Sequence, residues 1–248
     1  MSIRELPTAG YRYIEGAFQY SGGVQALPGH EVVRARFRQA PTLADGFMRI
    51  EQYLKAAGRP IAAFCACELR SAAPFSEAGF LAFNKHYIGQ LDRWGILQGG
   101  KSPLARSNVC PEISPPKETH FHAFSFTRPT TAKPPSFVIA GSGEAREGEG
   151  TYRERTVRYG DTSPDGMRDK ARQVLGEMER RLTAFGLSWS DTTDTQVYTV
   201  FDVHSYLADD LVRRGAARRG FTWHFDRPPI EGLDFEVDCR GVSVELVI

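Results

Sequence analysis

The chain has 248 residues, of which 41% are apolar and 25% are charged, and its 31 basic and 30 acidic residues leave a formal net charge of +1. A chain of this length and composition folds without disulfide bonds, as one large domain or two smaller ones, and is not a disordered protein. The balanced charge argues against a nucleic-acid partner. No apolar run approaches the roughly 20 residues that span a bilayer, which argues against a membrane partner.

The four cysteines and the first residues predict a cytoplasmic protein. Cys65 and Cys67 form a C-x-C pair, Cys110 and Cys239 stand alone, and the sequence contains no C-x-x-C. Such thiols are typical of a reducing compartment, where they pack as small apolar side chains. The N-terminus lacks the apolar core of a signal peptide, so we expect the chain to stay in the cytoplasm.

The first half of the chain predicts two helices, each next to a strand. The clearest is an amphipathic helix at 47–58, because Phe47, Ile50 and Leu54 fall on one face and Gly58 suits a left-handed helix end. In chain order, the expected elements are a strand at 17–21, this helix, a strand at 61–69, a helix at 80–94, a basic turn at 104–107, a double proline at 115–116 and an alternating strand at 119–126.

The second half repeats this order. Its longest element is a helix at 167–186 with a single apolar stripe and a final glycine, Gly186. In chain order, the expected elements are a strand at 136–140, an insertion at 141–166, this helix, a strand at 193–200, a short helix at 205–214, a basic turn at 216–219, a double proline at 228–229 and an alternating strand at 233–242.

The repeated order predicts two diverged copies of one β-β-α-β-α-β unit. The copies are residues 1–128 and 136–248, and residues 129–135, which include three prolines, form a semi-rigid linker between them. Helices of this kind need a sheet face to cover. We therefore expect an α+β fold with a mixed sheet covered by helices on one face.

The order of elements and the end of each copy resemble the reactive-intermediate deaminase family, also called RidA or YjgF. Residues 105–107 read Ala-Arg-Ser, and the segments 217–219, 228–229 and 235–239 are similar to the family's A-R-S, L-P and E-I-E-A-I motifs. The resemblance covers nearly the whole chain as two fused copies. It implies a chorismate-mutase-like, RidA/YjgF-type repeat, assembly as a homotrimer, and sites in clefts between adjacent repeats.

The resemblance also implies an activity. Family members hydrolyse enamines and imines of 2-oxo acids, release ammonia and need no metal or organic cofactor. Within the family, the tandem length is most similar to 2-aminomuconate-type deaminases of aromatic-compound degradation, and the tandem chorismatases also resemble it. Such a hydrolysis requires a fixed cation for the substrate carboxylate and a base that activates water.

Two arginines are candidates for substrate binding. A planar guanidinium clamps a carboxylate through two parallel hydrogen bonds, which suits it to this task. Arg106 and Arg219 occupy the positions that match the family's carboxylate-binding arginine. The alternative is a surface arginine in a basic turn, which we prefer for Arg218.

Glu236 is the candidate catalytic base. The resemblance matches it to the family's water-activating glutamate, and the alternation of the strand places Asp234, Glu236 and Asp238 on one face. A cleft with apolar walls raises the pKa of a carboxyl group and makes it a useful base. The alternative is the ordinary polar outer face of a half-buried strand, which we prefer for Asp234.

The first copy departs from this pattern. His120 and His122 stand where the second copy has Glu236 and Asp238, and residues at i and i+2 of a strand point to the same side. Three interpretations stay open: proton transfer, binding of a distal carboxylate, and metal ligation. We assign His120 to catalysis and His122 to substrate binding, and we expect no metal because no third ligand lies at a recognisable spacing.

Together these features predict a cofactor-free deaminase that assembles as a homotrimer and acts on a small carboxylate substrate. The expected reaction converts a 2-aminomuconate-like enamine diacid to the 2-oxo diacid and ammonia. Because a diacid needs cations at both ends, Arg153, Arg155 and Arg158 of the insertion are further candidates, unless that loop is simply solvated. The alternatives are a chorismatase-like hydrolase of an enolpyruvyl ether and a non-catalytic carboxylate-binding protein.

Overall fold

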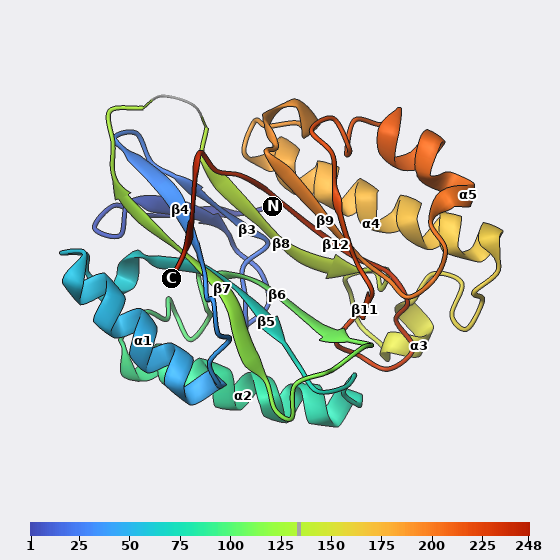
Figure 1. Ribbon diagram of the computed structural model, residues 1–248, viewed down its shortest axis with the longest axis horizontal. Helices are drawn as coiled ribbons and strands as arrows, with labels where there is room; N and C mark the ends of the chain where they lie inside the picture. Colours follow the sequence, from blue (N-terminus) through green and yellow to red (C-terminus); the bar gives the residue numbers. More distant parts are fainter. Residues whose placement is uncertain (133–134) are drawn as a thin grey trace.

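Two β-sheets lie face to face in the centre of the computed structural model, which describes residues 1–132 and 135–248 (Figure 1). In spatial order, the six-stranded sheet contains β11 (Asp226–Arg227), β6 (Ala105–Pro111), β5 (Phe64–Arg70), β7 (His120–Pro129), β4 (His30–Arg36) and β13 (Val244–Val247). The seven-stranded sheet contains β1 (Ile3–Leu6), β2 (Tyr11–Ile14), β3 (Gly23–Ala26), β8 (Phe137–Gly143), β12 (Glu236–Gly241), β9 (Asp194–Tyr198) and β10 (Thr222–His224).

Helices cover the outer face of each sheet (Figure 1). The six-stranded sheet carries α1 (Leu43–Ala56) and α2 (Glu77–Arg93). The seven-stranded sheet carries α4 (Pro164–Ala184) and a short helix, α5 (His204–Tyr206), that continues as a π-helical turn at Leu207–Val212. This arrangement confirms the predicted α+β fold with helices on one face of each sheet. A four-residue helix, α3 (Tyr152–Arg155), lies in the insertion that follows β8.

The predicted apolar stripes of the helices form the two main cores. Thr42 caps the N-terminus of α1, and Phe47, Ile50 and Leu54 are buried against the sheet as expected. The stripe of α4 is buried in the same way against the seven-stranded sheet. Both helices are followed by the expected glycine in the left-handed region, Gly58 at φ 65° and Gly186 at φ 74°.

The internal repeat is visible in the sheet topology. Four strands of each half lie in the same relative order, β6-β5-β7-β4 in the first half and β10-β9-β12-β8 in the second. The first pair of each set is parallel, and the other two pairs are antiparallel. Each half thus contains a β-α-β-α-β-β unit instead of the predicted β-β-α-β-α-β unit. The expected turn at 104–107 is the start of strand β6. Its residues are buried on both faces, so its sequence lacks the alternation that marks a half-exposed strand.

The two halves also exchange strands. The N-terminal strand β3 pairs with β8 of the second half, and the C-terminal strand β13 pairs with β4 of the first half. The predicted strand at 17–21 is a turn, and Ser21 makes only an isolated bridge with Ala105. The division at 128 and 136 stays a prediction about repeat limits. Within the predicted linker, β7 extends to Pro129 and residues 133–134 lie outside the described residues.

The described part of the chain contains no helix that combines the length and the apolar character needed to cross a membrane. All four cysteines are buried free thiols.

Candidate functional site

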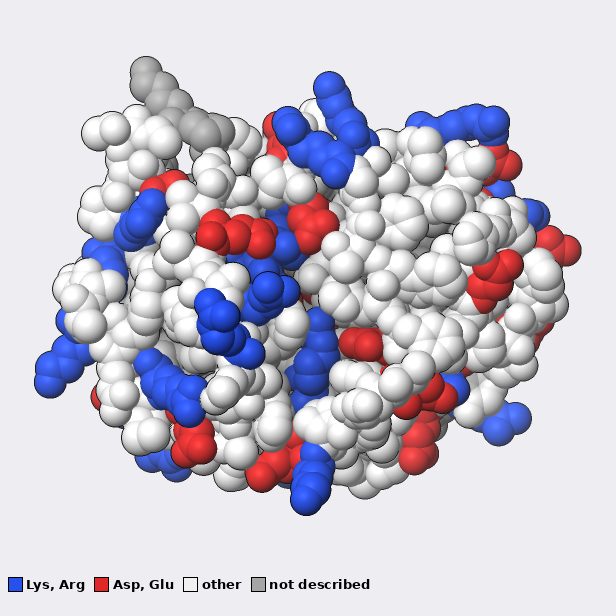
Figure 2. All heavy atoms as spheres, viewed as in Figure 1, with Lys and Arg blue, Asp and Glu red and all other residues white. Residues whose placement is uncertain are grey.

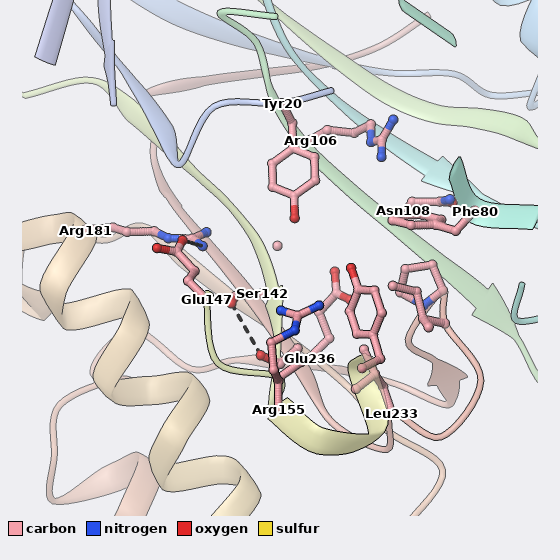
Figure 3. A pocket seen from close by; sticks show the side chains of 16 residues that line it. Tyr20, Phe80, Arg106, Asn108, Ser142, Glu147, Arg155, Arg181, Leu233 and Glu236 are labelled. Atoms are coloured by element: carbon pink, nitrogen blue, oxygen red, sulfur yellow. Dashed lines mark hydrogen bonds and ion pairs between the residues drawn. The ribbon is translucent and has the colours of Figure 1, made fainter. Parts of the chain in front are cut away.

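A cleft lies between the two halves of the chain (Figure 3). Its first wall comes from β6 and α2 of the first half, together with Tyr20. Its second wall comes from the end of β8, the insertion with α3, and the start of β12. Arg106 and Glu236 both line it, so the structure brings together the cation of one copy and the carboxyl group of the other.

Arg106 is a buried cation at one side of the cleft. It is 3% exposed, and its guanidinium lies over four aromatic rings, the nearest being Tyr87 at 4.7 Å. Its Nη2 donates to the Asn84 side-chain oxygen at 2.6 Å, while its Nη1 has no hydrogen-bond partner among the described residues. A buried donor without a partner is costly, so an acceptor-rich ligand is favoured beside Arg106.

Asn108 provides a second unpaired donor on the same wall. The side chain is 3% exposed, and its oxygen accepts a hydrogen bond from the Ser71 hydroxyl at 2.9 Å. That bond fixes the orientation of the amide, and its Nδ2 has no partner among the described residues. Arg106 and Asn108 point to the same side of β6 because they are two residues apart in the strand. Two such donors in one cleft match the acceptor groups of a carboxylate.

Glu236 lies at the first position of β12 and is 4% exposed. Burial, reinforced by Asp238 and Glu144, raises the pKa of Glu236 well above its ordinary value. The carboxyl group sits directly against the backbone of β8, because a Cβ atom placed on Gly141 would come within 2.2 Å of Glu236 Oε1. The group is therefore held in a low-dielectric site that favours its protonated form.

A buried acid–base cluster holds the residues just before Glu236. Both oxygens of the Glu144 carboxyl group accept backbone N–H bonds, from Asp234 at 2.7 Å and from Phe235 at 3.2 Å. Lys170 of α4 pairs with Asp234 and lies 3.6 Å from Glu144, and the Lys170 and Glu144 side chains are fully buried. Burial raises the pKa of Glu144 to about 7. This cluster ties the start of β12 to α4 and fixes the direction of Glu236.

Two further arginines line the cleft from the second half. Arg181 is nearly buried, pairs with Glu177 at 2.7 Å and Glu147 at 3.6 Å, and donates to the Ala140 carbonyl. Arg155 of α3 donates to the carbonyl oxygens of Gly150 at 3.1 Å and Arg146 at 2.7 Å. Figure 3 shows Arg106 and Arg155 on opposite sides of the cleft.

The other predicted site residues lie elsewhere. Arg219 is exposed in the turn before β10 and does not line the cleft. Strand register explains the difference from Arg106. In the first half, Ser107 of β6 is opposite Glu68 of β5. In the second half, Thr222 of β10 is opposite Gln196 of β9, the residue equivalent to Glu68, so Thr222 is equivalent to Ser107. Phe221 therefore stands where the first half has Arg106, and the sequence motif is displaced from the strand by the turn.

His120 and His122 occupy the positions that the sequence pattern predicts for them. His120 is opposite Arg70 in the six-stranded sheet, as Glu236 is opposite Tyr198 in the other sheet. Neither histidine lines the cleft. Their catalytic and substrate-binding roles stay predictions that this geometry does not support.

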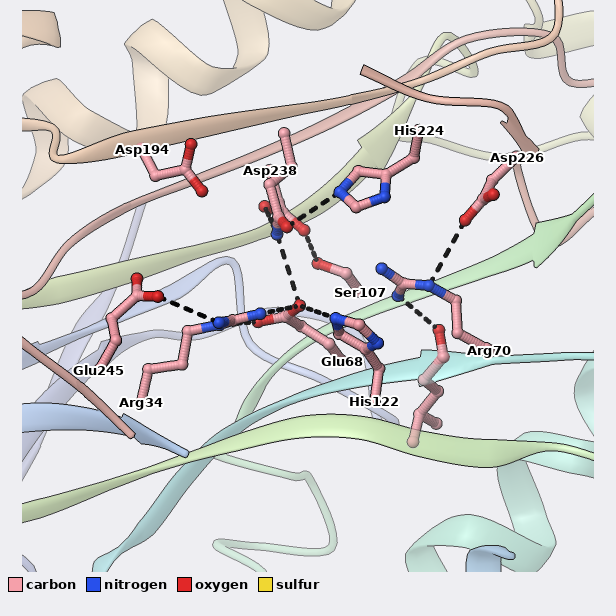
Figure 4. A network of polar contacts seen from close by, with 12 residues as sticks. Arg34, Glu68, Arg70, Ser107, His122, Asp194, His224, Asp226, Asp238 and Glu245 are labelled. Carbon is pink, nitrogen blue, oxygen red and sulfur yellow. Dashed lines mark hydrogen bonds and ion pairs between the residues drawn. The ribbon is translucent and has the colours of Figure 1, made fainter. Parts of the chain in front are cut away.

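His122 belongs instead to a polar network between the two sheets (Figure 4). Its centre is Glu68, which accepts from Arg34 at 2.6 Å and lies 4.0 Å from His122 Nε2. Burial, with Arg70 nearby, lowers the pKa of His122 to about 3, so this imidazole is neutral at pH 7 and carries no charge for a carboxylate. Within residues 1–132 and 135–248, no three His, Cys, Asp or Glu side chains are grouped as metal ligands.

The same network links the sheets across the chain. Asp238 accepts from Ser107 of the opposite sheet and from Gln196 and Tyr198 of its own sheet, at 2.5–2.9 Å. In Figure 2, basic and acidic side chains lie next to each other in the hollow at the centre of the viewed face. On this face of β12, Asp238 thus links the two sheets, whereas Glu236 lines the cleft.

Sequence reasoning missed Asn108, Glu144 and Lys170. One signal was available for Lys170, because a lysine between Met167, Ala171 and Val174 breaks the apolar stripe of its helix. A charged residue on a buried face requires a partner, and the partner here is the Glu144 and Asp234 pair. Asn108 gave no such signal, since an asparagine in a loop-like segment is common.

Comparisons with known proteins agree with this chemistry. A family model described as 2-aminomuconate deaminase CnbZ matches residues 3–246. The chain is 47% identical over 241 residues to a 2-amino-5-chloromuconate deaminase of Comamonas testosteroni, with 96% of each chain covered.

Two solved structures are weakly similar. The YjgF gene product of E. coli is 18% identical, with 44% of this chain and 80% of that chain covered and a TM-score of 0.31. A YjgF/YER057c/UK114 family member of Mycobacterium tuberculosis is 18% identical, with 47% and 82% covered and a TM-score of 0.29.

Proposed function

The chain belongs to the 2-aminomuconate deaminase family CnbZ and is a deaminase of the muconate type, and from this premise we propose how its cleft works. The proposed reaction converts a 2-aminomuconate-like enamine diacid and water to the 2-oxo diacid and ammonia, as a step in aromatic-compound degradation. One observation carries the proposal: a buried arginine with an unpaired N–H and a buried carboxyl group with a raised pKa face one cleft.

Arg106 binds the carboxylate next to the amino-bearing carbon. The free Nη1 of Arg106 and the free Nδ2 of Asn108 donate to its oxygens, and the aromatic rings around the guanidinium exclude competing water. Binding fixes the reacting carbon relative to Glu236, which lowers the entropic part of the barrier. Both donors are already immobilised by Asn84 and Ser71, so little order is lost on binding.

Glu236 exchanges protons with the substrate. In its protonated form, which burial favours, it gives its proton to the enamine carbon, and the carbon–carbon double bond shifts to form the 2-iminium group. The carboxylate left behind removes a proton from water, and the resulting hydroxide adds to the iminium carbon to form a carbinolamine. Glu236 is protonated again at this stage.

The last stage releases ammonia. Glu236 protonates the amino group, the carbon–nitrogen bond breaks, and the hydroxyl group becomes the 2-oxo group as its proton returns to Glu236. The balance is one enamine and one water consumed, and one 2-oxo acid and one ammonia formed. A single carboxyl group that can both give and accept a proton is sufficient, which is what a raised pKa provides.

An ammonia-release assay tests the proposal. Purified protein and freshly prepared 2-aminomuconate should yield ammonia and the 2-oxo diacid well above the spontaneous rate. Circular dichroism confirms that the protein is folded. Folded wild-type protein that releases no ammonia above the spontaneous rate would overturn the proposal.

We also propose that the chain forms a homotrimer, as its sequence resemblance implies. Both walls of the cleft come from one chain, so we expect the site to be complete in each subunit. Light scattering coupled to size-exclusion chromatography should give three times the mass of one chain. A mass of one or two chains would contradict the trimer.

We propose a cytoplasmic location, with small carboxylates rather than nucleic acid or membranes as partners. Four buried free thiols support a reducing compartment, and the balanced charge supports the choice of partners. Fractionation of cells that express the tagged chain should place it in the cytosolic fraction. Recovery in the membrane or secreted fraction would contradict this location.

A further inference from the structure

The proposed substrate has a second carboxylate, and the structure offers one cation for it. This inference rests on the proposed function, because it concerns the far end of the same cleft. Arg106 and Arg155 both line the cleft and lie on opposite sides of it (Figure 3). A six-carbon diacid has its two carboxylates at opposite ends of the carbon chain, so a pair of separated cations matches its charge distribution.

Arg155 is held in place without being neutralised. Its Nε and Nη1 donate to two backbone carbonyls, those of Gly150 and Arg146, and its guanidinium lies 4.5 Å from the centre of the Tyr152 ring. Among the described residues, its hydrogen bonds go to carbonyl oxygens and none goes to a carboxylate. The side chain therefore presents a full positive charge from a fixed position, and Nη2 remains available for a ligand.

Arg181 is less suited to this role. It lines the same cleft, but Glu177 and Glu147 already pair with its guanidinium, and its Nη1 donates to the Ala140 carbonyl. Its charge is balanced before any ligand arrives. Arg155 is also the more accessible of the two, because its side chain is partly exposed whereas Arg181 is 4% exposed.

We propose that Arg155 binds the distal carboxylate of the substrate and thereby selects diacids over monoacids. The residue acts on binding and selection, while proton transfer stays with Glu236. Its position in the insertion between β8 and α4 means that a segment outside the repeated unit supplies the specificity.

Matched acids of one chain length test this assignment. Adipate and hexanoate both have six carbons, and they differ only in the second carboxylate. Calorimetry should show that the wild-type protein binds adipate more tightly than hexanoate. Arg155→Gln should reduce that preference by roughly 10-fold, because the distal carboxylate loses a charge-assisted contact, and Arg155→Lys should restore part of it. In turnover, Arg155→Gln should raise KM for the diacid more than it lowers kcat.

Arg153 provides the matched control. It lies on the same short helix, is exposed, and faces the Tyr159 ring at 5.0 Å instead of the cleft. Arg153→Gln should leave the adipate preference unchanged. The assignment is overturned if the wild type shows no preference, or if Arg155→Gln weakens both acids equally, as a purely structural role would. Failure of the proposed function is a separate result, because it appears as no ammonia release whatever the binding preference.

Discussion

The two halves of the chain share one topology but carry different chemistry at equivalent positions. Strand β12 begins with Glu236 where β7 begins with His120, and strand β6 has Arg106 where Phe221 precedes β10. The first half thus contributes the cation and the second half the carboxyl group. Within the described residues, these two groups line one cleft. Under the proposed function, the two copies therefore perform different tasks.

The same comparison indicates a structural role for His122 of β7. His122 faces Glu68 and Arg70 in the layer between the sheets, and Asp238 of the other half occupies the same layer. The polar residue two positions after each strand start, His122 in β7 and Asp238 in β12, therefore belongs to the layer that links the sheets. Five predictions test whether the cleft is catalytic and the polar layer between the sheets is structural.

The largest effect is expected for the carboxyl group. Glu236→Gln should lower kcat by about 10²- to 10⁴-fold, because the amide can neither give nor accept the proton. His120→Gln, at the equivalent position of the first half, should stay within about twofold of wild type if only the cleft performs proton transfer. Steady-state ammonia release measures both. Equal losses in the two variants would show that the copies share catalysis.

Glu236→Gln should also change stability in a pH-dependent way. The folded-state pKa of Glu236 lies above its unfolded value, so the folded protein loses stability as pH rises from the unfolded carboxyl pKa through the raised one. The glutamine variant cannot ionise and should unfold at a higher temperature than wild type at pH 7. The difference should vanish below about pH 4. Thermal unfolding followed by circular dichroism measures it.

The second-largest effect is expected at the cation. Arg106→Gln should lower kcat/KM by roughly 10- to 100-fold, because the substrate carboxylate loses a buried charge-assisted contact. Arg219→Gln removes an exposed arginine from a turn and should leave kcat/KM within about twofold of wild type. A loss at Arg219 comparable with that at Arg106 would restore the role that the sequence motif predicts for it.

The contrast between Arg106 and Arg219 shows where sequence reasoning was sufficient. The helices were predictable because their apolar stripes repeat at helical spacing. Arg106 and Glu236 were singled out by the family resemblance, and the structure places both in one cleft. Arg219 could not be placed in this way. A motif fixes the order of residues but not the strand register, and one added turn before β10 separates the arginine from the edge.

The pairing between strands that are distant in the chain could not be predicted from the sequence either. Strands β3 and β13 join the sheet of the opposite half, and local periodicity carries no information about which strand is the partner. Asn108 became a site residue only through its neighbours, because Ser71 orients its amide and leaves Nδ2 free. Such roles depend on contacts between segments that are distant in the chain.

A smaller effect is expected where Glu236 rests against β8. Gly141→Ala would place a Cβ atom 2.2 Å from Glu236 Oε1, and the flexible carboxyl group must move away. We expect about a 10-fold loss of kcat, because a displaced base transfers protons poorly. Some loss of stability should accompany it, because the same Cβ would lie 3.2 Å from the Ser107 Cα. Gly89→Ala on α2 is the control, since open space surrounds that position and the helix should gain slightly. Equal activity in the two variants would mean that Glu236 tolerates displacement.

The smallest effect is expected in the layer between the sheets. The folded-state pKa of His122 is lowered to about 3, and its ring faces Glu68, Arg70, Arg34 and His224. The unfolded chain binds a proton at this histidine below about pH 6.5 while the folded chain does not, so folding stability falls as pH decreases from there towards 3.

His122→Asn removes this proton uptake. The variant should lose less stability than wild type between about pH 6.5 and 4, and its ammonia release at pH 7 should be unchanged, because the layer lies outside the cleft. His86→Asn on the exposed face of α2 is the control and should follow the wild-type stability curve. Urea unfolding across this pH range measures the difference. Parallel stability curves for wild type and His122→Asn would show that His122 does not contribute to the loss of stability at low pH. A loss of turnover in His122→Asn would show that His122 takes part in the reaction.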